Sequence, residues 1–426
     1  MKRVFTFLIA CCIGASMLTG CANNKKAQDN SEQQNNEVSK VENKDLFDGG
    51  SGSEEDPYKI SSAESLLKLA SSVNDGSQGG FANKYFLLTS DIDLADVDWT
   101  PIGNMNDKEK HSTFFLGSFD GDNHTILNLK YVSEEFNCGA GLFGVSCGTV
   151  KNLTVTNATV TVSEESSLAI AAVVGYNMGV VDNVTLSGEC TVTGNNCVGG
   201  IVGGNNNQVS NCNVDNATVI VIGNNKFEDR IIQADVAECG GLVIGGGFGG
   251  TINNCKATGV VKAEGNEPVG LGGIGGCLEM MDSITNCTAN VTIESEKGGH
   301  AIGGLCGYAG THSNPNICLE TEGFSTKNYP SIIDNCKVTV KIKAPGSTHV
   351  GGLVGTGLYY YGEETAFKIT NCSVYGTIDG AVNAGAIAGR AEGSTIENCT
   401  SEIIADGIVK TDQVGKTSCM YESADQ

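Results

Sequence analysis

The chain has 426 residues, of which 58 are glycine and 6 are proline, and its 26 basic and 49 acidic side chains give a net charge of −23. Such a charge repels phosphate, and arginine occurs only as Arg3, Arg230 and Arg390, so the basic patch that nucleic-acid binding needs is missing. Collagen and proline-rich disordered chains are excluded as well, because glycine has no three-residue period and proline is scarce.

The first segment, residues 1–20, has the pattern of an export signal. Lys2 and Arg3 precede an apolar run that is too short to span a bilayer. The run ends in Leu18-Thr19-Gly20-Cys21, which resembles a bacterial lipobox. An ordinary secretory signal with a chance cysteine is the alternative. The lipobox predicts cleavage before Cys21 and lipidation of the Cys21 thiol. Because two or three acyl chains anchor a protein stably, it also predicts attachment to a membrane.

Residues 21–45 are expected to form a lipidated, flexible tether. They are rich in Asn, Gln, Lys, Glu and Ser, and such a composition buries too little apolar surface to offset the entropy of ordering. The signal and the tether predict that the protein is lipid-anchored in the bacterial cell envelope, lies outside the cytoplasm and is exposed at the cell surface.

Residues 46–137 are expected to form a small α+β N-terminal capping region. An amphipathic segment begins at Ala63, with Leu66, Leu67, Leu69 and Ala70 on its apolar face. The region also carries carboxylates of the kind that calcium accepts, namely Asp91, Asp93, Asp96, Asp98, Asp120 and Asp122. No known calcium-loop spacing is present, so turn and edge carboxylates are the favoured interpretation and no cofactor is predicted.

Residues 138–405 contain one pattern eight times. Each copy has a glycine-rich apolar patch, a short interval, and an apolar residue followed two positions later by asparagine. The asparagines are Asn152, Asn183, Asn211, Asn254, Asn286, Asn335, Asn371 and Asn398. Their successive spacings are 31, 28, 43, 32, 49, 36 and 27 residues, and repeats of this length indicate a solenoid or an array.

Around each asparagine the apolar alternation breaks and then resumes, which indicates a strand, a corner and another strand. Asparagine tolerates the left-handed backbone of a corner, and stacked amides can bond from coil to coil. Short Val-, Ile- and Thr-rich strands predict an all-β fold, a parallel β-helix of about eight coils, with residues 406–426 as a C-terminal cap or tail. The capping region would cover the exposed edges at the other end.

The patches Gly141-Leu142-Phe143-Gly144, Gly304-Leu305-Cys306-Gly307 and Gly352-Leu353-Val354-Gly355 resemble those of the GLUG-motif proteins of bacterial cell surfaces. Repeats two and eight depart from the pattern, with Ala172-Val173-Val174-Gly175 and Gly385-Ala386-Ile387-Ala388-Gly389. The resemblance implies a surface location and an adhesin-like role, and it implies no catalytic residues.

Six cysteines follow the asparagines directly and should stack as an inward column: Cys212, Cys255, Cys287, Cys336, Cys372 and Cys399. A metal or redox ladder is one interpretation. A column of small buried hydrophobic side chains is favoured, because no Cys-x-x-Cys pair occurs and reactive thiols need exposure.

Two catalytic patterns are interpreted as coincidence. Gly144-Val145-Ser146-Cys147-Gly148 matches a nucleophile elbow, but the chain continues as a β repeat where a helix is needed. Residues 270–275 match a dinucleotide-binding fingerprint without the crossover helix that follows one. No catalytic constellation is found, and we expect a protein that is not an enzyme.

Two insertions concentrate aromatic residues. Repeats six and seven lengthen the same interval, giving Tyr308–Ser331 and Thr356–Phe367, so the insertions should emerge side by side. They carry the candidate ligand-binding residues Phe324, Tyr329, Tyr359, Tyr360 and Tyr361. Exposed aromatic rings can stack on sugars or dock a protein, although packing back on the solenoid is the alternative.

The favoured function is that of a lipid-anchored surface scaffold for binding or adhesion. The expected partners are a glycan or a host or matrix protein, the membrane holds the lipid anchor, and no binding to nucleic acid is expected. A polysaccharide lyase or hydrolase on a β-helix is one alternative. A purely structural envelope protein is the other.

Overall fold

The computed structural model describes residues 47–105, 112–165, 167–223, 238–265, 268, 270–279, 283–311, 331–359, 367–391 and 394–416. All of them belong to one compact unit, residues 43–426. The expected segments 1–20 and 21–45, with Cys21, lie outside the described residues.

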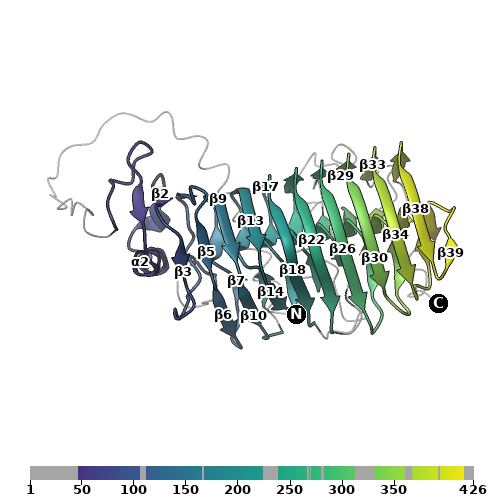
Figure 1. Ribbon diagram of the computed structural model, residues 1–426, viewed down its shortest axis with the longest axis horizontal. Coiled ribbons are helices and arrows are strands. Elements are labelled where there is room, and N and C mark those ends of the chain that lie inside the picture. Colours follow the sequence, from purple (N-terminus) through teal and green to yellow (C-terminus); the bar gives the residue numbers. More distant parts are fainter. Residues whose placement is uncertain are drawn as a thin grey trace, which may run out of the picture. The chain divides into compact units, whose positions relative to one another are not determined.

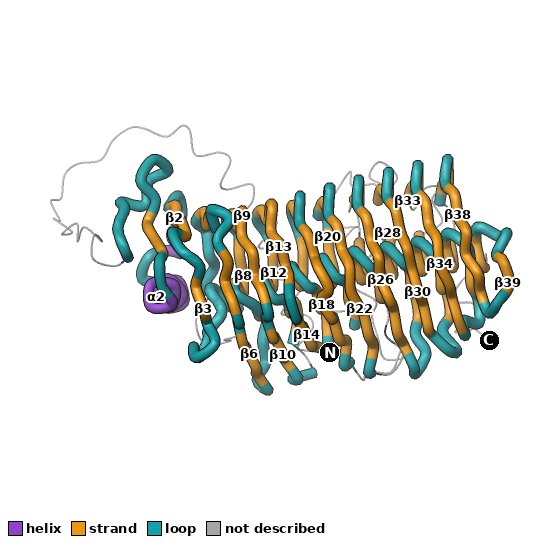
Figure 2. The backbone as a smooth tube through the Cα atoms, viewed as in Figure 1, coloured by secondary structure: helices purple, strands orange, loops and turns teal. Residues whose placement is uncertain are grey.

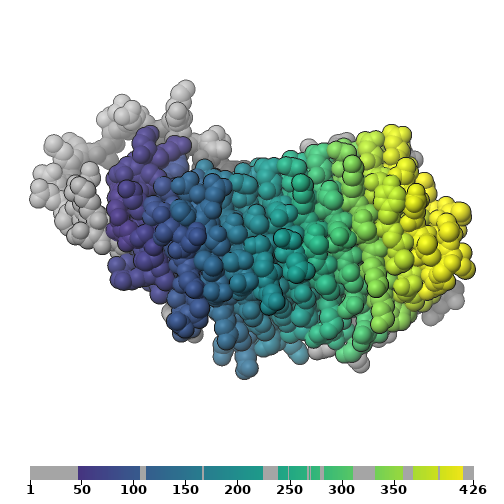
Figure 3. All heavy atoms as spheres, viewed as in Figure 1, coloured from purple at the N-terminus to yellow at the C-terminus, as the bar shows by residue number. Residues whose placement is uncertain are grey.

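The described chain winds as a parallel β-helix, as expected (Figure 1). Three sheets run along the stack, and nearly every strand pairs in parallel with its equivalent in the next coil. Figure 2 shows the strands of successive coils side by side, joined by short turns. Figure 3 shows the sequence advancing along the stack as successive colour bands.

The long sheet bends at the asparagine corners. Its strands are β1(Tyr58–Ile60), β2(Tyr85–Leu88), β3(Ile92–Asp93), β4(Ser118–Asp120), β5(Thr125–Leu127), β6(Lys130–Ser133), β9(Thr149–Thr156), β10(Thr159–Val162), β13(Val180–Ser187), β14(Cys190–Gly194), β17(Gln208–Ser210), β18(Asn213–Val221), β21(Thr251–Asn253), β22(Lys256–Ala263), β25(Ser283–Thr285), β26(Thr288–Ser295), β29(Ser331–Asp334), β30(Lys337–Lys343), β33(Phe367–Thr370), β34(Ser373–Asp379), β37(Thr395–Glu397), β38(Thr400–Ala405) and β39(Ile408–Val409).

Two narrower sheets close each coil, and each glycine patch forms the bend from the first of them into the second. The first contains β7(Cys138–Ala140), β11(Leu168–Ile170), β15(Asn196–Gly199), β19(Cys239–Gly241), β23(Gly270–Gly272), β27(His300–Gly303), β31(Thr348–Gly351) and β35(Ala384–Gly385). The second contains β8(Phe143–Ser146), β12(Val174–Asn177), β16(Val202–Asn205), β20(Ile244–Phe248), β24(Gly275–Glu279), β28(Cys306–Thr311), β32(Val354–Tyr359), β36(Ala388–Ala391) and β40(Val414–Lys416).

Glycine is required where the two narrow sheets pack backbone against backbone. A Cβ atom at Gly307 in β28 would lie 2.4 Å from the backbone nitrogen of Leu271 in β23. At Gly355, one coil further, it would lie 2.2 Å from the backbone nitrogen of Ile302 in β27. Real Cβ atoms do not approach backbone atoms so closely. Glycine as the last residue of the patch therefore allows the two narrow sheets to lie this close together.

The N-terminal region contains the expected helix and also extends the solenoid. β1, β2 and β4 pair in parallel one after another and lead to β9. Aromatic rings pack against one another at this end, since the ring centroids of Phe86 and Phe115 lie 5.9 Å apart and those of Phe115 and Phe143 lie 5.1 Å apart. The first coils therefore use large aromatic side chains where the later coils use small ones.

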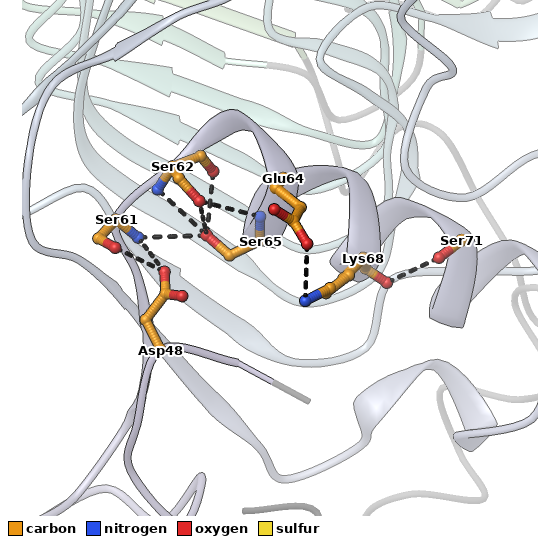
Figure 4. Close-up of polar contacts among 7 residues, drawn as sticks. All are labelled: Asp48, Ser61, Ser62, Glu64, Ser65, Lys68 and Ser71. Carbon is orange, nitrogen blue, oxygen red and sulfur yellow. Dashed lines mark hydrogen bonds and ion pairs between the residues drawn. The ribbon is translucent and has the colours of Figure 1, made fainter. Parts of the chain in front are cut away.

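Helix α2(Ala63–Asn74) begins at a capping box (Figure 4). The hydroxyl of Ser62 accepts the backbone N–H of Ser65 at 3.2 Å, and the Ser65 hydroxyl accepts that of Ser62 at 3.1 Å, an arrangement that satisfies two otherwise unpaired donors. Leu66, Leu69 and Ala70 are buried as expected, whereas Leu67 is only partly buried. η2(Gly79–Phe81) follows the helix.

Candidate binding surface

The asparagines lie one above another at the corners of successive coils. All eight have a left-handed backbone, with φ between 52° and 58°. Asn183 donates from Nδ2 to Oδ1 of Asn152 at 2.8 Å, Asn254 donates to Asn211 at 2.7 Å, and Asn335 donates to Asn286 at 2.8 Å. The amide both permits the corner and bonds it to its neighbour.

A second polar column takes part in this ladder, and it is formed by the residue before each asparagine. Asp182 Oδ1 accepts from the Ser210 hydroxyl at 2.6 Å and from Asn211 Nδ2 at 2.7 Å. Asp334 Oδ1 accepts from Thr370 at 2.6 Å and Asn371 at 2.8 Å. These bonds hold the pKa of the Asp334 carboxyl below its ordinary value.

The cysteines after the asparagines are stacked inside the coil. Cys212, Cys255, Cys287, Cys336 and Cys372 are buried, and Cys399 in the last coil is half-buried. Each thiol donates to the carbonyl two residues earlier, at the corner, as Cys287 does to Thr285 at 3.2 Å. The thiol thus serves as a small apolar filler that also satisfies a corner carbonyl.

A second group of buried thiols lies between the narrow sheets. Cys197, Cys239 and Cys277 pack with Tyr308, and the sulfur atoms of Cys239 and Cys197 are 4.0 Å apart. The described cysteines are all free thiols. Burial raises the pKa of Cys190, and contact with a neighbouring thiol together with burial raises the pKa of Cys212 and Cys277.

Alkaline pH is therefore expected to destabilise the protein. Folding raises the pKa of such a thiol above its value in the unfolded chain, which is about 8.5. The thiol therefore stabilises the folded state fully at pH values below about 8.5, and this stabilisation is lost as the pH rises toward the folded-state pKa. The free energy of unfolding should fall above pH ~8.5 by about 1.4 kcal/mol per pH unit for each such thiol. Urea denaturation across this pH range measures the slope, which should be shallower in Cys212→Ala and Cys277→Ala, and an unchanged slope would contradict the assignment.

Asp91, Asp93 and Asp120 of the capping region are engaged in turns and in the corner ladder. Asp91 accepts the Thr125 N–H at 2.8 Å, Asp93 accepts from Asn128 at 2.8 Å, and Asp120 pairs with Lys151 at 3.2 Å. Within the described ranges, no group of three or more His, Cys, Asp or Glu residues is placed to hold a metal ion. For Asp91, Asp93 and Asp120, the interpretation as turn and edge carboxylates agrees with these hydrogen bonds.

Both coincidental catalytic patterns lie within the repeats. Ser146 is fully buried at the end of β8. Residues 270–275 form β23, a bend and the start of β24.

The two aromatic insertions leave from neighbouring strands. β28 and β32 are parallel partners, with Thr311 opposite Tyr359, so the insertions begin side by side as expected. Both begin later than the sequence indicated, since Tyr308 and Thr356 are buried within these strands. Of the candidate ligand-binding residues, Tyr359 ends β32, and Phe324, Tyr329, Tyr360 and Tyr361 lie outside the described residues.

The outer face of the long sheet carries a polar surface that the sequence pattern did not predict. Side chains on β22, β26, β30 and β34 alternate inward and outward, and four register columns face solvent. In the first three columns lie Lys256, Thr258, Val260, Thr288, Asn290, Thr292, Lys337, Thr339, Lys341, Ser373, Tyr375 and Thr377. We call this set the lysine face; the four strands are side by side in Figure 1.

The signal for the lysine face is hidden in the sequence. Lys256 and Lys337 are 81 positions apart, yet both lie opposite Thr288. Insertions of unequal length separate the coils, so the register is needed before these side chains can be placed together.

Comparisons with known proteins show that the chain is similar to segments of longer proteins. It is 32% identical over 149 residues to a candidate Gly-rich membrane protein of Evansella cellulosilytica, covering 33% of this chain and 16% of that one. It is 43% identical over 93 residues to halomucin of Haloquadratum walsbyi, covering 21% of this chain and 1% of that one. An immunoglobulin A1 protease of Streptococcus sanguinis is 26% identical over 261 residues, 59% of this chain and 12% of that one. The chain thus spans a small part of each relative.

A solved structure, described as a candidate immunoglobulin A1 protease from Bacteroides ovatus, has a TM-score of 0.49 and 24% identity, covering 70% of this chain and 80% of that one. No family model matches the chain. The described residues contain no helix that is long and apolar enough to cross a membrane.

The expectation that the protein is not an enzyme is contradicted by these findings. The relative that aligns with 59% of the chain is named as a protease. The expectation relied on the lack of a catalytic motif in the repeats, but a segment of similar sequence also occurs within a protein that is named as a protease. A repeat segment alone does not reveal whether its protein is an enzyme.

Proposed function

We propose that this chain is a lipid-anchored β-solenoid of the bacterial cell surface whose outer faces bind ligands outside the cell. The lipobox ending in Cys21 and the polar tether of residues 21–45 support the anchor and the display. The GLUG-like patches support the surface location.

The observation that carries the binding role is the exposed outer face of the long sheet. The inward columns are packed with small apolar side chains, so the fold depends on them. The outward columns are exposed and vary from coil to coil. A rigid sheet holds such side chains in a fixed array and reduces the ordering that binding would otherwise cost.

The Streptococcus sanguinis relative favours a second function, action on immunoglobulin A1 or attachment to it. The similarity covers 12% of that protease. The solenoid would then be the segment that holds the immunoglobulin while a catalytic site cleaves the immunoglobulin.

One experiment tests both functions. The purified chain is applied to an array of neutral glycans, acidic glycans, matrix proteins and immunoglobulin A1, and the immunoglobulin is afterwards examined for cleavage by gel electrophoresis. Selective retention of one ligand class is expected. Retention of none would overturn the binding role, and a cleaved heavy chain in the absence of other proteases would establish the second function.

A further inference from the structure

The lysine face differs in charge from the rest of the protein. The chain carries a net charge of −23, yet the three columns of the lysine face hold Lys256, Lys337 and Lys341 and no carboxylate. Acidic groups border it on three sides. Glu294 and Asp379 lie in the fourth column on either side of Lys343. Asp215 lies opposite Thr258 on β18, and Glu402 lies opposite Tyr375 on β38. Beyond a Debye length of about 8–10 Å, the remaining acids are screened at physiological salt.

The three ammonium groups are available to a ligand. All three lysines are exposed, and none of them forms an ion pair with any residue that the structure describes. Lys262, in the fourth column, differs: its Nζ pairs with Glu264 at 2.8 Å, and that contact raises its pKa. Lys262 is thus neutralised by its own neighbour, whereas the first and third columns leave three positive charges without an ion pair among the described side chains.

An exposed aromatic ring lies among these charges. Tyr375 is 44% exposed and is placed opposite Thr339 on the neighbouring strand, with Lys337 and Lys341 two residues to either side of that threonine. Tyrosine offers an apolar ring face and a polar hydroxyl, which suits the C–H face and hydroxyl groups of a sugar ring. The threonine, serine and asparagine side chains around it add hydrogen-bond donors and acceptors.

The spacing of the lysines suits an extended ligand. Lys256 and Lys337 are two strands apart, about 10 Å, and Lys337 and Lys341 are four residues apart along one strand, about 13 Å. One exposed ion pair contributes only about 0–1 kcal/mol in water. A chain with repeated carboxylates can engage two or three lysines at once, and linked contacts strengthen one another.

We propose that the lysine face binds an acidic polysaccharide that carries carboxylates on its sugar rings. The carboxylates pair with Lys256, Lys337 and Lys341, one ring stacks on Tyr375, and the hydroxyl and amide side chains bond the sugar hydroxyls. This inference rests on the proposed binding function and names the ligand class and the site.

Binding to polygalacturonate tests this assignment, with fully methyl-esterified polygalacturonate as the uncharged form of the same backbone. The purified chain is expected to bind the charged form and not the ester, with affinity falling as salt rises. A variant with Lys256→Gln, Lys337→Gln and Lys341→Gln should lose about tenfold or more in affinity, because each pair contributes up to about 1 kcal/mol. Tyr375→Ala should weaken binding and leave the salt dependence unchanged.

A matched variant controls for net charge. Lys59→Gln, Lys84→Gln and Lys130→Gln remove three positive charges from the N-terminal coils and should leave affinity within about twofold, since these sites are remote from the lysine face. Equal losses in the two triple variants, equal binding of acid and ester, or no binding of polygalacturonate would overturn this inference. If the chain then still retained a neutral glycan or a protein, the proposed binding function would stand; if it retained nothing, both would fail.

Discussion

Gly355→Ala is expected to lower the free energy of unfolding by about 3 kcal/mol, at the upper end of the range for overpacked interiors. The added Cβ would lie 2.2 Å from the backbone nitrogen of Ile302, 2.3 Å from the carbonyl carbon of Ala301 and 2.6 Å from the oxygen of Gly307. All three are backbone atoms of the preceding coil, within β27 and β28. None of them can move aside like the end of a flexible side chain. Urea denaturation followed by circular dichroism measures the loss.

Gly346→Ala is the matched control. Gly346 has φ of 74° and no atom within 4 Å of its added Cβ, so only the left-handed backbone disfavours alanine, by about 1–2 kcal/mol. If the two variants lost the same stability, close packing of the narrow sheets would not be the reason for glycine at position 355.

Asn286→Ala is expected to cost about 2 kcal/mol. Alanine at a φ of 58° is disfavoured by about 1–2 kcal/mol. The substitution also removes the bond that Asn286 donates to Asn253 Oδ1 and the one it accepts from Asn335, both at 2.8 Å. These two hydrogen bonds are exposed to solvent, so each contributes no more than the usual net value of about 0.5–1.5 kcal/mol. Thermal and urea unfolding measure the change.

Asn286→Gly separates the two causes. Glycine adopts the left-handed conformation without steric cost, so this variant loses the amide bonds alone and should be affected less than the alanine variant. A glycine variant as unstable as the alanine variant would assign the whole effect to the amide ladder and contradict the backbone contribution.

The regular features of the coil could be predicted because they recur once per turn. Asn254, Asn286 and Asn335 occupy one structural position, and the cysteine after each points inward to the same column. Asparagine suits a left-handed corner and cysteine suits a small buried site, so residue type and period led to the same fold. The thiol bond to the corner carbonyl, as from Cys287 to Thr285, was not foreseen, because it depends on the bend itself.

The first coils were harder to predict because they lack the repeated residues. Phe86 and Phe115 fill the interior there with rings and pack toward Phe143 of the first repeat, and no glycine patch or asparagine corner marks the strands β1 and β2. The sequence therefore suggested a separate cap where the structure also continues the parallel sheet.

The lysine face depends on register, which the sequence does not contain. Lys341 and Tyr375 become neighbours only when β30 and β34 are aligned, and the interval between them includes an insertion of unrelated length. Outward positions also lack a fixed residue type, because packing does not constrain them.

Distances between spin labels at Thr154, Lys256 and Thr400 test the stacked-coil architecture most directly. These three positions lie in one register column, seven strand steps from Thr154 to Thr400 and four from Lys256 to Thr400. At about 4.8 Å per step, the backbone separations are about 34 Å and about 19 Å. Two narrow distributions that differ by about 14 Å are the predicted result. Broad distributions, or distances that do not scale with the number of coils, would contradict the parallel β-helix and the binding face built on it.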